Sequence, residues 1–484
     1  MASVNKIIKS ILNVNDVVID NASLDLNERN EKVLKVHLHP QKKEMARCPI
    51  CGCKCSIYDR TPKERMWRGL DAGGLIVELY YRVNRVVCPN HNVIVESVPW
   101  AFHNSGFTKD FDMVASFIAL ATNKTMAAKY MRCDWKTILR SLTRTRNYIE
   151  PDPKKRLDGL VNIGIDETSY CNGHNYITVV VNHDTNTVVW VGLGHSTETL
   201  SEFFELLTTK QRQSIKNVSG DGARWIDACI KKYIPHATRC VDGFHVVTWA
   251  MEALDSVRKD IWRDAQNSYK EAKNTTSSTR GRPSKEEQTE RKKLDEAKEK
   301  VSSIKNAKYA LGKAPENLTE NQKAKLDFIS NTHVKLFRAY KLKELLRLVF
   351  KPHSREAAEK IIDSFFWKAT HSRIQIFKEL GHKIKRHKTN ILNTIEQVLS
   401  NARVESINNK IKLSIRKAYG FRNYENMVDM IMLVCSKLSI PLPNRGVLVM
   451  QGVNVHNFLF LPIDMHDDSY FTRKLNYTNN MDLT

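Results

Sequence analysis

The chain has 484 residues, 42% of them hydrophobic, and its 76 lysines and arginines outnumber its 53 acids to give a net charge of +23. This length predicts two to four domains, and the excess of positive charge predicts a polyanionic partner. The sequence shows neither a run of 18 apolar residues nor an N-terminal signal segment, so we expect a cytoplasmic protein with no membrane partner. Ten cysteines in such a chain argue against a disulfide framework and favour a metal site.

Residues 1–100 contain two short motifs with the spacing of metal ligands. Cys48-Pro49-Ile50-Cys51-Gly52 is followed by Cys88-Pro89-Asn90-His91, and each motif offers two ligands separated by two residues. This is the spacing of a structural Zn²⁺ site, and alternation in residues 32–38 and 74–83 predicts strands beside it. We therefore predict an N-terminal zinc-ribbon domain. Cys53 or Cys55 could replace one of the four ligands, and free thiols with a surface His91 are the alternative.

Residues 101–150 have helical periodicity that is interrupted at Arg132-Cys133-Asp134. Short helices over 125–131 and 135–146 predict a helix-turn-helix domain that binds DNA, although any packing of three helices gives a similar pattern. The second helix would expose its cations to DNA phosphates: Lys136, Arg140, Arg144 and Arg146.

Residues 151–250 change to the period of strands. Strands are expected at 161–167, 175–182, 187–194, 216–219 and 237–241, with helices at 198–212 and 224–233. This order predicts a mixed, ribonuclease-H-like sheet. Asp166 and Asp221 end the first and fourth strands, and Asp242 and His245 follow the fifth. Sites in open α/β sheets gather at the carboxyl ends of strands, although acids there also cap turns.

The domain of residues 151–250 and 396–440 is the expected catalytic domain, with the ribonuclease-H-like sheet. Residues 251–395 are predicted to be a helical insertion in it. They contain a polar break with an Arg280-Gly281-Arg282-Pro283 core, in which Arg280 and Arg282 could enter a DNA minor groove. A flexible linker explains the same composition and is the interpretation that we favour.

Residues 396–440 should complete the catalytic domain, followed by a tail over 441–484. A helix over 401–412 and beyond would place its apolar residues on one flank: Val404, Ile407, Ile411 and Ile415. Glu405, Asn409, Lys412 and Arg416 fall on another flank. Residues 368–423 have 13 Lys or Arg against three acids, so Lys410, Lys412 and Arg416 would form a basic belt around Glu405 that binds DNA.

Three carboxylates that converge on two divalent cations can cleave phosphodiesters without a nucleophilic side chain. Mg²⁺ prefers oxygen ligands and keeps several waters, so three carboxylates are sufficient to hold the ions. The sequence spacing of Asp166, Asp221 and Glu405 does not by itself show that they meet.

Six segments together resemble the ISL-three family of insertion-sequence transposases over nearly the full chain. These segments are residues 48–52, the helix-turn-helix, and residues 165–167, 242–246, 401–412 and 416–421. The resemblance implies a DDE transposase with a ribonuclease-H-like fold and an insertion before the glutamate. It assigns the catalytic and metal-binding triad to Asp166, Asp221 and Glu405, with two Mg²⁺ or Mn²⁺ ions. His91 stands where the zinc motif of the family usually has a fourth cysteine, and Cys₃His is a valid zinc set.

The resemblance also implies that Asp242-x-x-His245 is the signature that follows the second catalytic aspartate, with an accessory role in holding a flipped base or the scissile strand. A helix cap at His245 is the alternative. The expected partners are double-stranded DNA, as terminal inverted repeats and target DNA, and further copies of the chain in a homodimer or higher oligomer. Such a protein would be associated with the nucleoid of a bacterium. A catalytically silent, transposase-derived DNA-binding protein and a nuclease or resolvase on the same fold are the alternatives.

Overall fold

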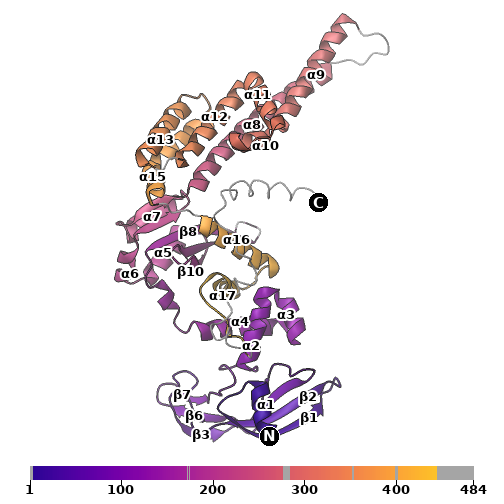
Figure 1. Ribbon diagram of the computed structural model, residues 1–484, viewed down its shortest axis with the longest axis vertical. Helices are drawn as coiled ribbons and strands as arrows, with labels where there is room; N and C mark the ends of the chain where they lie inside the picture. Colours follow the sequence, from indigo (N-terminus) through magenta and orange to yellow (C-terminus); the bar gives the residue numbers. More distant parts are fainter. Residues whose placement is uncertain are drawn as a thin grey trace.

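The computed structural model describes residues 4–171, 173, 175–275, 284–351, 354–397 and 402–443. Along its long axis, two small N-terminal sheets are followed by a three-helix unit, a five-stranded sheet and a group of helices at the far end (Figure 1). None of the described helices is long and apolar enough to cross a membrane.

The N-terminal region contains two sheets, of strand order β1-β2-β5-β4 and β3-β6-β7, which extend the predicted ribbon. β2 and β5 confirm the two predicted strands and pair in parallel, whereas the other strands were not predicted. Trp67, Leu79 and Trp100 pack in the core of this region. The elements are α1 (Val4–Leu12), β1 (Val17–Leu26), β2 (Lys32–Pro40), β3 (Ser56–Arg60), β4 (Arg65–Arg68), β5 (Ile76–Tyr81), β6 (Asn84–Cys88) and β7 (Asn92–Val95).

Three helices follow, namely α2 (Lys109–Ala121), α3 (Lys124–Met131) and α4 (Trp135–Ile149). Each begins after a polar residue whose side chain accepts a hydrogen bond from the first turn: Thr108, Asn123 and Asp134. Arg132 adopts a left-handed conformation and ends α3. The structure therefore confirms the predicted interruption between two short helices.

A short 3₁₀ turn, η1 (Pro153–Leu157), leads into a five-stranded sheet of order β10-β9-β8-β11-β12. β8, β11 and β12 run parallel to one another, while β9 is antiparallel to both β8 and β10. Its strands and helices are β8 (Asn162–Cys171), β9 (Asn175–Asn182), β10 (Thr187–Leu193), α5 (Thr197–Leu206), α6 (Thr209–Ser214), β11 (Asn217–Gly220), α7 (Arg224–Tyr233) and β12 (Thr238–Val241). The single helix predicted over 198–212 is two helices, because Thr208 and Gln211 form a capping box that starts α6.

Both faces of this sheet are covered, which explains the consecutive valines at positions 179–181 of β9. Val180 packs with Phe203, Ile226 and other residues of α5 and α7 on one face. Val179 and Val181 pack on the other face in a core shared with the three-helix unit and the C-terminal helices.

A long helical segment separates β12 from the C-terminal helices (Figure 1). α8 begins at Gly243, so the predicted boundary at 250 lies inside one helix. The segment comprises α8 (Gly243–Thr275), α9 (Lys285–Lys305), α10 (Lys308–Gly312), η2 (Pro315–Asn317), α11 (Glu320–Thr332), α12 (Val334–Arg347), η3 (Leu348–Phe350), α13 (Arg355–Thr370), α14 (Gln375–Arg386) and α15 (Lys388–Gln397).

The chain then returns to the sheet through α16 (Ala402–Lys417) and α17 (Tyr424–Cys435). The apolar flank predicted for the first of these helices is confirmed, because Val404, Ile407, Ile411 and Ile415 are all buried against the sheet and the three-helix unit. Helix α16 thus carries Glu405 to the sheet from far along the sequence.

Candidate functional site

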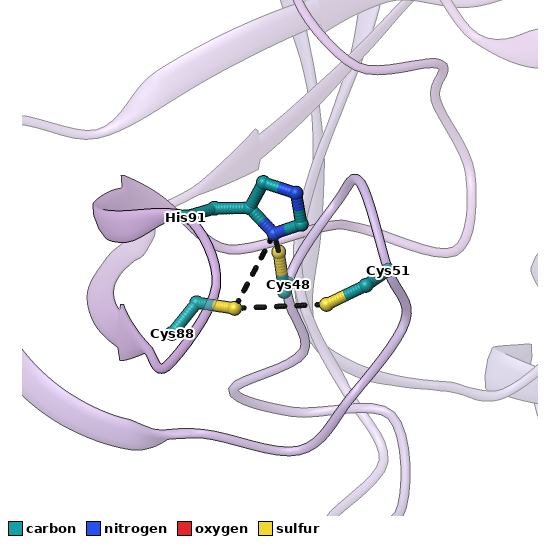
Figure 2. A group of neighbouring side chains, drawn as sticks. All are labelled: Cys48, Cys51, Cys88 and His91. Atoms are coloured by element: carbon teal, nitrogen blue, oxygen red, sulfur yellow. Dashed lines mark hydrogen bonds between the residues drawn. The ribbon is translucent and has the colours of Figure 1, made fainter.

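Four predicted zinc ligands from two separate loops meet in the N-terminal region (Figure 2). The Nδ1 atom of His91 lies 3.5 Å from the sulfurs of both Cys48 and Cys88, and the Cys51 sulfur lies 3.6 Å from that of Cys88. A tetrahedral zinc ion would place such ligand atoms about 3.5–3.8 Å apart. Gly52 allows this approach because its φ of +72° suits the tight turn that closes the first knuckle.

The electrostatics of this cluster also suit a metal. Burial opposes ionisation of Cys88, but the backbone amide of Asn90 and the side chain of His91 outweigh it and lower the pKa of the thiol to about 5. A thiolate at neutral pH is the form that binds Zn²⁺. Cys53 lies 3.2 Å from Cys51 and 3.6 Å from Cys88, sulfur to sulfur, so it is within reach of the same ion. The residues present therefore fit a structural zinc.

A row of aspartates lies where the parallel pairing of three strands of the larger sheet ends. Ile165 of β8 pairs with Gly220 of β11, which in turn pairs with Val241 of β12. Asp166, Asp221 and Asp242 are the next residues, so they share one edge of the parallel part of the sheet, on strands about 4.8 Å apart. The end of β8 was predicted wrongly, because β8 continues to Cys171 against β9 and only its pairing with β11 stops at Ile165.

The row concentrates negative charge on three half-buried side chains. Burial, together with Asp221 and Asp242, raises the pKa of Asp166 to about 6, although His245 acts in the opposite direction. Burial also raises the pKa of Asp242, whose Oδ2 lies 3.9 Å from Nε2 of His245. Like charges this close favour either a proton or a bound cation.

Helix α16 crosses β8 beside this row. A Cβ atom on Gly164 would lie only 2.5 Å from Cγ2 of Val404, so the glycine permits the close approach of the helix. One turn further, Nδ2 of Asn408 donates a hydrogen bond of 2.6 Å to Oδ2 of Asp166. Glu405 is half-buried and lies three residues before Asn408, a separation that places two side chains on the same side of a helix. Glu405 therefore lies on the same side of α16 as Asn408, which contacts Asp166.

The carboxylate oxygens of this region do not converge to the mutual distances of a compact metal-ligand cluster in the described part of the structure. Within the described part of the chain, only the cysteine clusters bring ligand atoms of three or more His, Cys, Asp or Glu within 4.8 Å of one another. Asp166 is oriented by its neighbours, because Oδ1 accepts from the backbone amide of Glu167 at 2.8 Å while Oδ2 accepts from Asn408.

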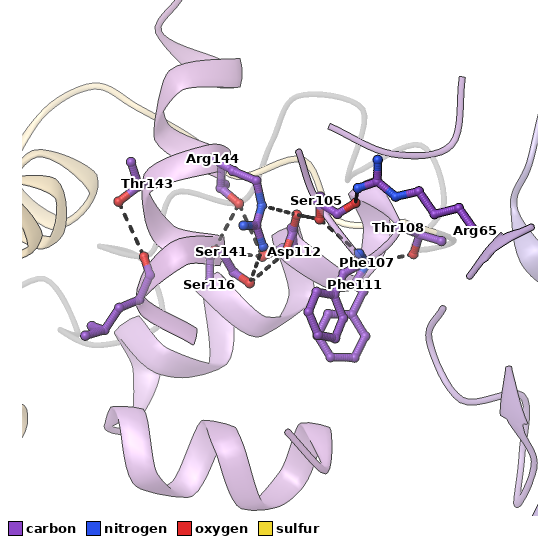
Figure 3. Close-up of polar contacts among 12 residues, drawn as sticks. Arg65, Ser105, Phe107, Thr108, Phe111, Asp112, Ser116, Ser141, Thr143 and Arg144 are labelled. Carbon is purple, nitrogen blue, oxygen red and sulfur yellow. Dashed lines mark hydrogen bonds and ion pairs between the residues drawn. The ribbon is translucent and has the colours of Figure 1, made fainter. Parts of the chain in front are cut away.

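The cations predicted to contact DNA on α4 differ in exposure. Lys136 and Arg140 are exposed. Arg144 does not face solvent as predicted, because its Nε and Nη2 atoms each donate a 2.7 Å hydrogen bond to Asp112, which is fully buried (Figure 3). Arg146 is half-buried as well and pairs with Asp429 of α17. Helical spacing alone could not distinguish exposed cations from those that neutralise buried acids.

The remaining predicted DNA contacts lie on α16 or outside the described residues. Lys412 and Arg416 are exposed and Lys410 is half-buried. Arg280 and Arg282 lie outside the residues that the structure describes.

Sequence reasoning missed two side chains that hold the acids in place. Asn408 was noted only as part of a motif, and its bond to Asp166 depends on tertiary contact. Arg239 of β12 donates to the backbone carbonyl of Asp221 and, through Nε, to Asp227 at 3.0 Å. The sequence signal for Arg239 was a cation in the middle of the short predicted strand over 237–241.

Comparison of the N-terminal zinc ribbon and the mixed α/β domain with known families identifies the class of protein as a transposase. A family model described as "Transposase" matches residues 163–431, and one described as "zinc-finger of transposase IS204/IS1001/IS1096/IS1165" matches residues 44–91. The chain belongs to the ISL-three (ISL3) transposase family, as its sequence motifs predicted.

Two curated bacterial relatives are similar over most of their length. The transposase for insertion sequence element IS1557 of Mycobacterium tuberculosis is 39% identical over 411 residues, which cover 84% of this chain and 90% of the relative. The transposase for insertion sequence element IS1001 of Bordetella parapertussis is 27% identical over 401 residues, which cover 81% and 89%.

Proposed function

We propose that this transposase is of the DDE type, binds the terminal inverted repeats of its insertion sequence, and cleaves and joins DNA strands at Asp166, Asp221 and Glu405. The observation that carries the proposal is the strand register, which aligns Ile165 with Gly220 and so brings Asp166 beside Asp221. The bond from Asn408 to Asp166 adds the helix that contains Glu405. Residues from three distant segments thus gather at one edge of the sheet.

The strand order and the interruption before α16 support a ribonuclease-H-like fold with an inserted helical segment. The predicted order of strands along the chain is observed, and these strands form one sheet of order β10-β9-β8-β11-β12 with β9 antiparallel to its neighbours. The acids lie at the carboxyl ends of the parallel pairing, where sites gather in open α/β sheets.

The donor set fits divalent cations that prefer oxygen. Asp166, Asp221 and Glu405 would hold two Mg²⁺ or Mn²⁺ ions, which supply activation of a water or 3′-hydroxyl and stabilisation of the leaving oxygen. Asn408 would keep the Asp166 carboxylate in one orientation. Its Oδ1 is a buried acceptor without a partner among the described residues, which is an atom that an ordered water would satisfy.

The proposed DNA surface combines the zinc domain, α2–α4 and α16. α3 and α4 with the intervening turn at Arg132 would act as a helix-turn-helix, with Lys136 and Arg140 on phosphates. The helix that contains Glu405 also carries three cations that would bind DNA, namely Lys410, Lys412 and Arg416. The net charge of +23 is consistent with a polyanionic partner. Two repeat ends must be held together for joining, so we propose a homodimer or higher oligomer on DNA.

Asp242 and His245 are proposed to be accessory residues that hold a flipped base or the scissile strand. Their support is positional: Asp242 follows β12 in the same row as Asp166 and Asp221, and His245 lies one helical turn beyond it at the start of α8.

The test is strand cleavage and joining on duplex DNA that carries the repeat end, with Mg²⁺ or Mn²⁺, by Glu405→Gln and its parent. Glu425→Gln is a matched control, because Glu425 is an exposed glutamate in the first turn of the next helix, α17. Loss of cleavage in Glu405→Gln alone, with DNA binding retained, is the expected result. Equal activity in both variants would reject the site.

The same assay separates the other functions. Binding of repeat ends without cleavage by the parent, with either metal, would identify a silent DNA-binding protein. Cleavage of branched DNA without preference for the repeat would identify a nuclease or resolvase.

A further inference from the structure

A lysine of the helical insertion lies beside the loop of Asp221. Lys383 of α14 places Nζ 3.5 Å from the ring centroid of Trp249 on α8. Trp249 in turn packs on Gly222, the residue after Asp221, where an added Cβ would lie 2.6 Å from Cη2 of the indole. Trp249 of α8 therefore packs on the loop that holds one of the proposed metal ligands, and Lys383 of α14 lies against the indole.

Among the described residues, no carboxylate lies within ion-pair distance of Lys383. None of the ion pairs of 4.0 Å or less among the described residues includes Lys383, although its ammonium group interacts electrostatically with Asp221 at longer range. Burial lowers the pKa of Lys383, and Asp221 and Glu252 counteract this in part. A half-buried ammonium whose close partner is an aromatic ring retains the capacity to bind an anion.

Nearby cations of the same region have other surroundings. Lys385 is exposed and lies over Phe366, with Nζ 4.5 Å from the ring centroid. Lys388 pairs with both Glu359 and Asp363. Lys383 differs from both lysines because its aromatic partner packs on the loop of Asp221 and its charge interacts with that carboxylate.

We infer that Lys383 binds a non-bridging oxygen of a DNA phosphate next to the bond that is cut. This inference rests on the proposed function and adds to it a substrate contact supplied by the insertion. A phosphodiester is the anion that fits, because it is the substrate that the neighbouring acids and their cations would act on. Trp249, itself packed on Gly222, holds the lysine in place, so the contact would form without reorganisation of a flexible side chain.

The experiment compares Lys383→Gln, Lys383→Met and Lys383→Arg with the matched control Lys385→Gln. Single-turnover cleavage is measured with Mg²⁺ on repeat-end duplexes in which one phosphate flanking the cut is replaced by a neutral methylphosphonate. On unmodified DNA we expect Lys383→Gln and Lys383→Met to cleave about 10- to 100-fold more slowly, Lys383→Arg to recover part of the rate, and Lys385→Gln to stay within about twofold of the parent. Lys383→Met would keep the apolar stem on Trp249, and melting curves are recorded to check that the variants fold.

Neutral phosphates distinguish a DNA contact from a purely structural role. At the contacted position, the parent and Lys383→Gln should cleave at the same rate, because the charge that Lys383 binds is absent. The inference would be overturned if Lys383→Gln cleaved more slowly than the parent by the same factor whichever flanking phosphate is neutral. Lys383 would then act only through the protein. Cleavage by Lys383→Gln as fast as by Lys385→Gln would overturn it too. Absence of cleavage by the parent would instead refute the proposed function.

Discussion

Replacing Arg144 by methionine tests whether this cation supports the fold or binds DNA. The guanidinium makes two hydrogen bonds of 2.7 Å to Asp112, a side chain with no exposed surface. Asp112 also accepts from Ser141 at 2.6 Å and from Ser105 at 3.1 Å, so it joins the segment before α2 to α4 (Figure 3). Removal of Arg144 leaves this carboxylate buried with two hydroxyl partners.

The expected loss follows from that geometry. Removing one partner of a buried ion pair costs about 3–5 kcal/mol, and the two remaining hydroxyl groups place Arg144→Met at the lower end, about 3 kcal/mol. At about 1.4 kcal/mol for each factor of ten, opening of α2–α4 becomes more frequent by roughly 100-fold.

Amide hydrogen exchange in α2–α4 and urea unfolding measure this loss. Arg140→Met is the control, because it removes the same charge from an exposed position one turn earlier and should unfold like the parent. Adding Asp112→Asn to Arg144→Met should recover part of the stability, because the unpaired charge is then gone. The structural role would be refuted if Arg144→Met were as stable as the parent while the salt dependence of its DNA binding fell by about one phosphate contact.

Three further predictions concern the metal and the sheet. Chelation should remove one zinc per chain and increase exchange in β3, β6 and β7, and Cys88→Ser should lose more zinc than Cys55→Ser in metal analysis. Gly164→Ala should lower the free energy of unfolding by about 1–3 kcal/mol in urea titrations, because its Cβ would overlap Val404, and adding Val404→Ala should recover part of this. In metal-free protein, folded Asp166 keeps a proton that the unfolded chain has lost between about pH 4 and about pH 6. Its contribution to stability therefore falls as pH rises through this window, and Asp166→Asn should lack that slope in pH-dependent melting.

The structure changes how the basic character of the chain relates to DNA. Helical spacing predicted that four cations of α4 would all be exposed to DNA, but two of them neutralise buried acids and only two are exposed. The helical segment before α16, expected as an insertion, packs Trp249 on the loop of Asp221 and places Lys383 over that indole. These differences follow from packing between segments that are far apart in sequence.

Local sequence determined the features whose cause is local. Two ligands separated by two residues form a knuckle whatever surrounds them, so Cys48, Cys51, Cys88 and His91 could be predicted as one metal site. The apolar spacing of α16 likewise predicted its buried flank, because both periodicity and burial are properties of a single helix. The strands around Asp166 and Asp221 were predicted from their alternation and apolar content.

Tertiary structure decided which of these residues meet. Parallel register places Asp242 in the row with Asp166 and Asp221, and the missing side chain of Gly164 lets α16 approach closely enough for Asn408 to reach Asp166. No periodic pattern encodes such contacts, because each depends on the distance between backbones that belong to different elements. The same reason explains why sequence could name Arg144 as a cation while only the folded chain shows Asp112 beside it.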